Sequence, residues 1–153
     1  WQYPQFLHTK SRHEERLAEF LGQKLPPLKG AINISHDSPQ AIFYGFYSVE
    51  PGFRWTEGQE AHLSFVLEKK ELAGEILLIS DFLGDQQMTI SLNETQVYKG
   101  TFTGGEKEIR FRIPPEVLKS GLNTFTFYLP DAQKPPGNDP RILAMAFRKL
   151  SIQ

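Results

Sequence analysis

Charged and aromatic side chains interrupt two strand-like segments in the first half of the chain. The break contains Glu50, Phe53, Arg54 and Trp55 within six residues. A loop that only reverses the chain direction is built from Gly, Pro, Asn and Asp. A guanidinium and an indole are better suited to bidentate hydrogen bonding and to stacking on a flat ring. This break is a candidate binding loop, with the alternative that Trp55 fills the core and Arg54 pairs with Glu50 to hold the loop.

A second charged group precedes the last apolar segment of the chain. Asp139 and Arg141 follow a Pro-Pro-Gly-Asn segment that cannot form regular structure, so residues 131–139 are predicted to be an irregular loop at the rim of the fold. The carboxylate and amide oxygens of this loop are ligands that Ca²⁺ prefers, but their spacing matches no metal loop, and we predict no metal site. Arg141 is expected either to contribute to a ligand-binding rim or to dock the final strand through a salt bridge.

Other reactive side chains give weaker patterns. Asp81 and Asp85 flank a turn and could form the paired carboxylates of a glycosidase, although Asp near Gly is also expected in any hairpin turn. The histidines, at positions 8, 13, 36 and 62, have no zinc-binding spacing. No phosphate loop, nucleophile elbow or dinucleotide fingerprint is present. The sequence therefore predicts no catalytic residues and no cofactor.

The elements that must position these residues are predicted to be β-strands. Apolar and polar residues alternate with period two in most of the chain. The predicted strands are 31–35, 41–47, 60–67, 75–82, 87–93, 95–102, 107–113, 122–129 and 141–152. Strands joined by turns, with almost no helix between them, indicate an all-β fold: an antiparallel β-sandwich of jelly-roll type.

The N-terminal region differs from the remainder. Ser11 followed by Glu14 forms a capping box before an amphipathic segment, which predicts a short helix ending near Gly22. Consecutive prolines then indicate an extended linker. We therefore divide the chain into residues 1–29, a helix with a Pro-containing linker, and residues 30–153, a β-sandwich domain.

The composition limits the partners of the chain. Its 153 residues carry 17 basic and 18 acidic side chains, so no overall charge attracts nucleic acid or anionic lipid. Cysteine is absent, which excludes disulfides and thiolate chemistry. No apolar segment is long enough to span a membrane. The sequence begins at Trp1, without methionine, and we expect it to be part of a longer polypeptide.

The spacing of Gly45, Glu50 and Arg54-Trp55-Thr56, with the later segment 139–144 (Asp-Pro-Arg-x-Leu-Ala), resembles a known module. This is the β-sandwich found at the C-terminal end of bacterial envelope-glycan enzymes, such as phosphoglycerol transferases of osmoregulated glucans and polysaccharide glycosyltransferases. The resemblance covers residues 42–152. It implies binding roles for five residues of this sequence, which are Glu50, Arg54, Trp55, Asp139 and Arg141. Because the family tends to have Trp-Gly where this chain has Gly52-Phe53, Phe53 is expected to replace a tryptophan as the sugar platform.

The resemblance implies a non-catalytic, carbohydrate-binding-like accessory module. Its expected partners are a polysaccharide or oligosaccharide and the catalytic transferase domain of the same or a partner chain. It also implies a bacterial cell-envelope location, with the periplasm favoured over the cytoplasmic face of the inner membrane. The alternative hypothesis is a structural or assembly β-sandwich that docks onto a partner domain without binding glycan, in which the charged residues form an internal ion-pair cluster.

Overall fold

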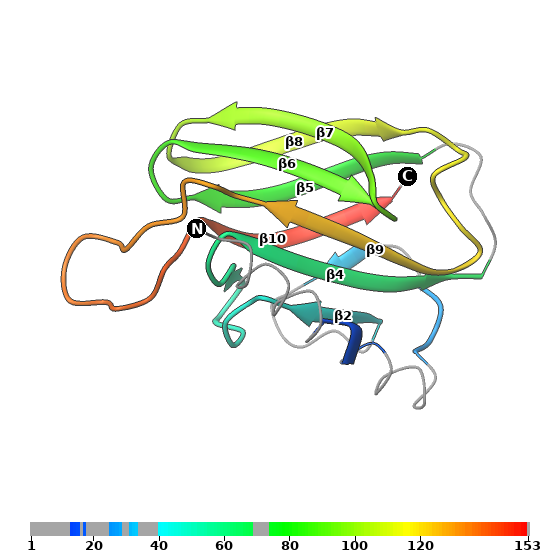
Figure 1. The fold of residues 1–153 in the computed structure, drawn as a ribbon, viewed down its shortest axis with the longest axis horizontal. Coiled ribbons are helices and arrows are strands. Elements are labelled where there is room, and N and C mark those ends of the chain that lie inside the picture. Colours follow the sequence, from blue (N-terminus) through cyan, green and yellow to red (C-terminus); the bar gives the residue numbers. More distant parts are fainter. Residues whose placement is uncertain are drawn as a thin grey trace.

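The computed structural model describes residues 13–15, 17, 25–28, 31–33, 40–68 and 74–152, and their regular structure is almost entirely β-strand (Figure 1). The strands are β1 (Ala31–Asn33), β2 (Ala41–Tyr44), β3 (Arg54–Trp55), β4 (Glu60–Leu67), β5 (Gly74–Phe82), β6 (Gln86–Leu92), β7 (Thr95–Phe102), β8 (Gly105–Ile113), β9 (Gly121–Tyr128) and β10 (Met145–Ile152).

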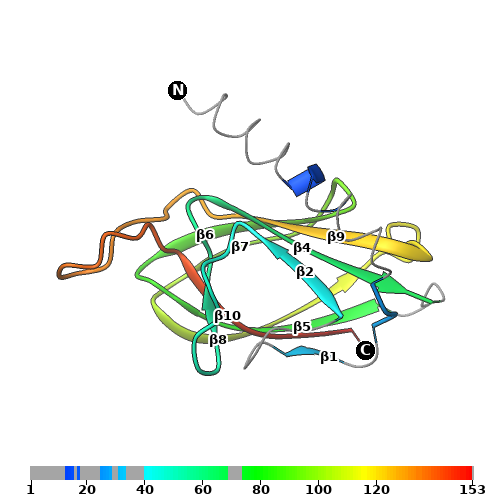
Figure 2. The same cartoon turned by 90° about the horizontal axis from the view of Figure 1, so that it is seen from below.

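The strands form two antiparallel sheets that pack face to face, as Figure 2 shows from the side. The first sheet has the order β2–β4–β9–β6–β7, and the second has the order β1–β10–β5–β8, with β3 also paired to β10. Both sheets combine strands that are far apart in the sequence. The predicted all-β, jelly-roll sandwich is confirmed.

Alternating side chains from both sheets fill the space between them. Along β5 and β6 every second residue is buried and the residues between are partly or fully exposed. This is the pattern of sheets with one buried and one solvated face. The largest fully buried side chains are Phe65, Phe125, Phe127, Phe147, Ile42, Leu63, Ile76, Leu78, Met88 and Ile90.

Two strand boundaries differ from the prediction by three residues or more, and one short strand was not predicted. β2 ends at Tyr44 instead of residue 47, because Gly45 adopts a φ of 78°, which breaks the extended conformation. β10 was predicted to begin at residue 141. It begins at Met145, the residue that pairs with Phe82 on β5. β3 was not predicted, because its two residues are too few to show a period.

The described part of the N-terminal region contacts the sandwich. Residues 13–15 and 17 are helical, and the rest of the predicted helix lies outside the described residues. Within the predicted linker, the Leu28 amide donates a hydrogen bond of 2.7 Å to the Val66 carbonyl on β4.

Two loops meet at one end of the sandwich. The long orange loop of residues 129–144 projects from this end in Figure 1. The second loop connects β3 to β4. Its Gly58 amide donates a hydrogen bond of 3.1 Å to the Ile142 carbonyl, and its Thr56 hydroxyl accepts one of 3.0 Å from the Met145 amide. The fold thus brings the two charged groups singled out from the sequence to the same rim.

Candidate functional site

A tight turn presents the first group of residues. Glu50 and Phe53 exchange two backbone hydrogen bonds, of 2.8 and 3.2 Å, across Pro51 and Gly52. Pro before Gly, with a Gly52 φ of 84°, is the combination that a type II turn requires. The chain then enters β3, where neighbouring side chains point to opposite faces.

The register of the second sheet determines which face each residue occupies. Ala146 on β10 pairs with Trp55 on one side and with Asp81 on the other. Directly paired residues point to the same face of a sheet. Because Phe82 belongs to the core, Asp81 and with it Trp55 lie on the outer, solvent-facing side.

Phe53 and Trp55 form a half-exposed aromatic pair on this outer face. Their ring centroids are 6.2 Å apart and their planes are inclined at 83°, the edge-to-face arrangement that aromatic quadrupoles favour. The Arg148 guanidinium lies 5.6 Å from the centre of the Phe53 ring and donates hydrogen bonds to one oxygen of Asp81, with an Nε–Oδ2 distance of 2.7 Å. We call these four residues the Phe53–Trp55 surface.

Arg54 points to the opposite, inward side of β3. Its Nε donates a hydrogen bond of 3.1 Å to the Tyr47 carbonyl, and its guanidinium carbon lies 4.5 Å from the centre of the Phe43 ring. It is also 5.9 Å from the Phe46 ring. Arg54 is therefore positioned to hold the 45–55 loop against the edge of the core.

Glu50, Asp139 and Arg141 meet at the rim, together with Tyr47. Arg141 Nε and Nη2 donate to the Asp139 carboxylate at 2.8 to 3.1 Å, and Nη1 lies 3.4 Å from Glu50 Oε2. The guanidinium carbon is 5.4 Å from the Tyr47 ring centre. We call these four residues the rim cluster. Glu50 pairs with Arg141, whereas the sequence suggested Arg54 as its partner.

The ion pairs of the rim cluster shift the protonation equilibria of their members. Hydrogen bonds from the Arg141 side chain and backbone lower the pKa of Asp139 below its usual value, and the Asp139 hydrogen bond raises the pKa of Arg141 further. About a third of each side chain is exposed, at 31% for both, so solvent screens much of the interaction.

The six residues selected from the sequence thus fall into three environments. Phe53 and Trp55 form the outer aromatic pair, Arg54 supports the loop from the inside, and the other three meet at the rim. Sequence reasoning missed Tyr47 and Arg148. Nothing in the sequence marks Arg148, because its direction depends on a register irregularity of β10 between Phe147 and Lys149.

The geometry gives the two remaining acidic candidates different surroundings. The Asp81 carboxylate forms an ion pair with Arg148, and Asp85 is exposed in the turn between β5 and β6. Among the described residues, no group of three or more His, Asp or Glu side chains is arranged to hold a metal ion. Within the same residues, no helix is both long enough and apolar enough to span a membrane.

Comparison with known proteins identifies the fold class. No protein-family model matches the sequence, and no curated protein sequence matches it. Among solved structures, the chain is similar to the acetyl xylan esterase Est2A from the rumen bacterium Butyrivibrio proteoclasticus, with a TM-score of 0.51 and 10% identity over 84% of this chain and 32% of that one. It is also similar to a family 35 carbohydrate binding module from an environmental isolate, with a TM-score of 0.50 and 15% identity over 80% of this chain and 91% of that one. The chain spans about a third of the esterase and nearly the whole binding module. At these identities the likeness establishes the β-sandwich fold.

Proposed function

We propose that this chain is a non-catalytic, carbohydrate-binding accessory module of a bacterial cell-envelope enzyme that modifies or synthesises glycans. The observation that carries the proposal is the half-exposed Phe53–Trp55 pair on the outer face of the second sheet. The fold similarity to a family 35 carbohydrate binding module along nearly the whole length of that module supports the same class of function.

The Phe53–Trp55 surface combines the two kinds of group that bind sugars. Aromatic rings offer apolar faces for the C–H groups of a pyranose, while the Asp81 and Arg148 side chains offer acceptors and donors for its hydroxyls. Asp81 and Arg148 neutralise each other at 2.6 Å, so they present hydrogen-bonding groups without a net charge. These properties favour a neutral glycan held with modest affinity.

The rim cluster extends this surface towards the end of the sandwich. Glu50 lies in the loop before β3 and Arg141 in the loop before β10, and both remain partly exposed, at 38% and 31%. Glu50 and Asp139 orient the guanidinium of Arg141 and can accept hydrogen bonds from sugar hydroxyls. A glycan bound at both groups would be held near a catalytic transferase domain of the same or a partner chain, which raises its effective concentration there. We place the module in the bacterial envelope, with the periplasm favoured.

A second candidate function is a structural or assembly module. The Arg54 contacts with Phe43 and the Tyr47 carbonyl favour it, because a residue implicated in binding by the sequence is used to hold the fold together. The Arg141 ion pairs with Glu50 and Asp139 also fit an internal cluster. The two candidates differ in whether any glycan binds at the Phe53–Trp55 surface.

Calorimetric titration with bacterial envelope glucans and O-polysaccharides tests the proposal. We expect saturable binding that weakens on the order of 10-fold in Trp55→Ala, because the variant removes one of the two stacking rings. Absence of binding by every glycan tested would leave the structural module as the better account.

Tyr128→Ala is the matched control. Tyr128 is 38% exposed at the end of β9, in the other sheet, so its removal deletes an exposed aromatic ring away from the proposed surface. We expect it to bind glycan as the parent chain does. An equal loss of affinity in both variants would count against a site at Trp55.

A further inference from the structure

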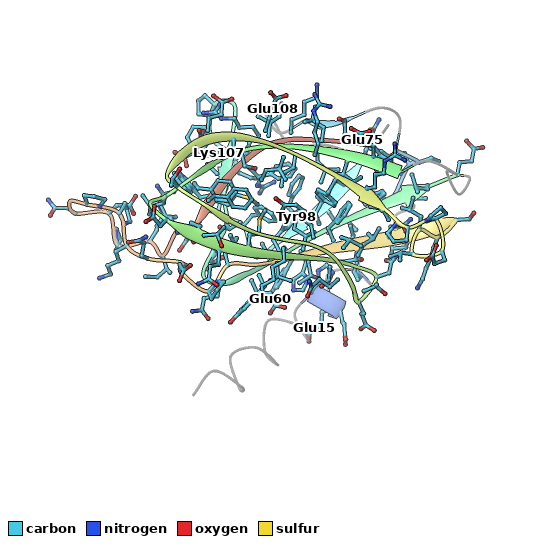
Figure 3. The ribbon with its side chains drawn as sticks, turned by 90° about the horizontal axis from the view of Figure 1, so that it is seen from above. Glu15, Glu60, Glu75, Tyr98, Lys107 and Glu108 are labelled. Atoms are coloured by element: carbon cyan, nitrogen blue, oxygen red, sulfur yellow. The ribbon has the colours of Figure 1, made fainter. Side chains whose placement is uncertain are left out.

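His13 lies at the contact between the N-terminal helical turn and the outer face of β4. It is buried, with 5% of the residue exposed, and its imidazole stacks on that of His62 with ring centroids 4.3 Å apart and planes inclined at 14°. The Tyr44 ring lies 5.8 Å from His13. Figure 3 shows the helical turn against this side of the sandwich, near the labelled Glu15 and Glu60, with Glu108 on the opposite side.

This contact lies on one row of the first sheet. His62 pairs with Tyr44 on β2 and with Thr126 on β9, so all three side chains point to the same outer face. His62 Nδ1 is 3.1 Å from the Thr126 hydroxyl, and its Nε2 is 3.9 Å from a Glu60 oxygen. The His13 ring packs against Tyr44 and His62 of this row.

Within the described part of the chain, the groups in contact with the His13 ring are an aromatic ring and a second imidazole. Within the described residues, neither ring nitrogen of His13 has a hydrogen-bond partner. From β2 it meets the Tyr44 ring, and from β4 it meets the His62 ring, whose Nε2 is 3.9 Å from a Glu60 oxygen. On its own helical turn, Glu14 and Glu15 are exposed to solvent.

A proton on His13 therefore weakens this contact. A buried imidazolium loses its hydration, and a positive charge stacked on a second histidine is repelled whenever that histidine is also charged. Burial lowers the pKa of His13 to about 4 from a usual value of 6.5. A group whose pKa is lowered by docking favours the docked state above its ordinary pKa and opposes it as the pH falls towards the lowered value.

We propose that the stacked His13–His62 pair is a pH-sensitive latch, which holds the N-terminal helical turn on the outer face of β4 at neutral pH and releases it in mildly acidic solution. Release uncovers the row of Tyr44, His62 and Thr126. The latch and the Phe53–Trp55 surface lie on the outer faces of different sheets, so this inference does not depend on the proposed function.

Paramagnetic broadening measures the contact directly. The chain has no cysteine, so Glu15→Cys provides a single attachment point for a nitroxide on the exposed side of the helical turn. At about pH 7.5 we expect the label to broaden the amide signals of His62 and Thr126. Between about pH 7.5 and about pH 5 the docking equilibrium should fall roughly 30-fold, so the broadening should weaken reversibly.

His13→Phe keeps a stacking ring and removes the titrating group. In this background we expect the broadening to persist at about pH 5, whereas Glu14→Gln, the matched change of an exposed neighbour, should behave as the parent chain does. Unchanged broadening in the parent chain, the same loss in His13→Phe, or a lost pH response in Glu14→Gln would overturn the latch. If His13→Phe fails to dock at neutral pH, the His13 ring titration in the parent chain decides: a pKa well below 6.5 supports the latch and an ordinary one refutes it.

Discussion

At the scale of single residues, Arg54 and Arg141 serve different purposes, although both were selected from the sequence as sugar ligands. Arg54 is directed inward by its place on β3 and contacts Phe43 and a backbone carbonyl. Arg141 is directed outward and contacts two carboxylates and a tyrosine ring. Their positions imply different consequences when each is changed.

Arg54→Ala is expected to destabilise the fold without altering the exposed aromatic pair. The variant loses the cation–π contact of 4.5 Å with Phe43 and the hydrogen bond to the Tyr47 carbonyl. Together these interactions indicate a loss of about 2 kcal/mol in the free energy of unfolding. Urea denaturation measures this change. A loss below about 0.5 kcal/mol, as for an ordinary surface substitution, would show that Arg54 does not support the loop.

The ionisation of Asp139 provides a second test at this scale. Because its folded-state pKa is below the unfolded value of 3.8, the ion pair with Arg141 is intact at neutral pH and is lost as the pH falls through the lowered pKa. An NMR titration of the Asp139 carboxyl group should show this low pKa. The Arg141→Gln variant should return the pKa towards its ordinary value, and a titration identical in both proteins would contradict the ion pair.

At the scale of elements, the rim depends on how β2 ends and how the chain crosses to β3. Gly45 follows the end of β2 in a left-handed conformation, and its α-carbon lies close to the backbone of Glu60 and Ala61 on β4. The type II turn at Pro51 and Gly52 then reverses the chain and starts β3. The backbone conformation of this loop therefore decides which faces Phe53, Arg54 and Trp55 occupy.

Gly45→Ala should disturb this element strongly. A Cβ atom at this position would lie 2.6 Å from the Glu60 carbonyl oxygen and 3.0 Å from the Ala61 Cα, and both are backbone atoms that cannot rotate away. With the added cost of a left-handed φ, we expect a loss of about 2–4 kcal/mol in unfolding free energy. Thermal and denaturant unfolding measure it.

Gly58→Ala separates the two causes. Gly58 also has a left-handed φ, of 69°, but a Cβ atom there would meet nothing within 4 Å. This control should cost only about 1–2 kcal/mol. Equal losses at both positions would show that the close approach of Gly45 to β4 is unimportant.

The elements also show how far the sequence alone could lead. Strands such as β4 and β9 were predicted within one residue, because their apolar residues alternate regularly and face one core. β3 could not be predicted, since its two residues pair with a strand about 90 positions later, and only that register places Trp55 beside Asp81. Glu50 was likewise expected to pair with its neighbour Arg54, whereas the fold brings Arg141 closer.

At the scale of the whole molecule, the candidate functional regions lie on different parts of the sandwich. The Phe53–Trp55 surface lies outside the second sheet, the rim cluster lies at one end, and the helical turn covers part of the first sheet. With a formal net charge of −1 and an internally neutralised Asp81–Arg148 pair, the proposed glycan would be recognised by shape and hydrogen bonding. This arrangement fits a module that holds a neutral glycan on one face.

Amide chemical-shift mapping of the isotope-labelled chain, titrated with envelope glucans and O-polysaccharides, tests this account most directly. We predict saturable shifts centred on Phe53, the Trp55 indole and Arg148, with smaller shifts at Arg141 and none around His62. Shifts confined to another face, or no saturable shifts with any glycan, would contradict glycan capture at the Phe53–Trp55 surface.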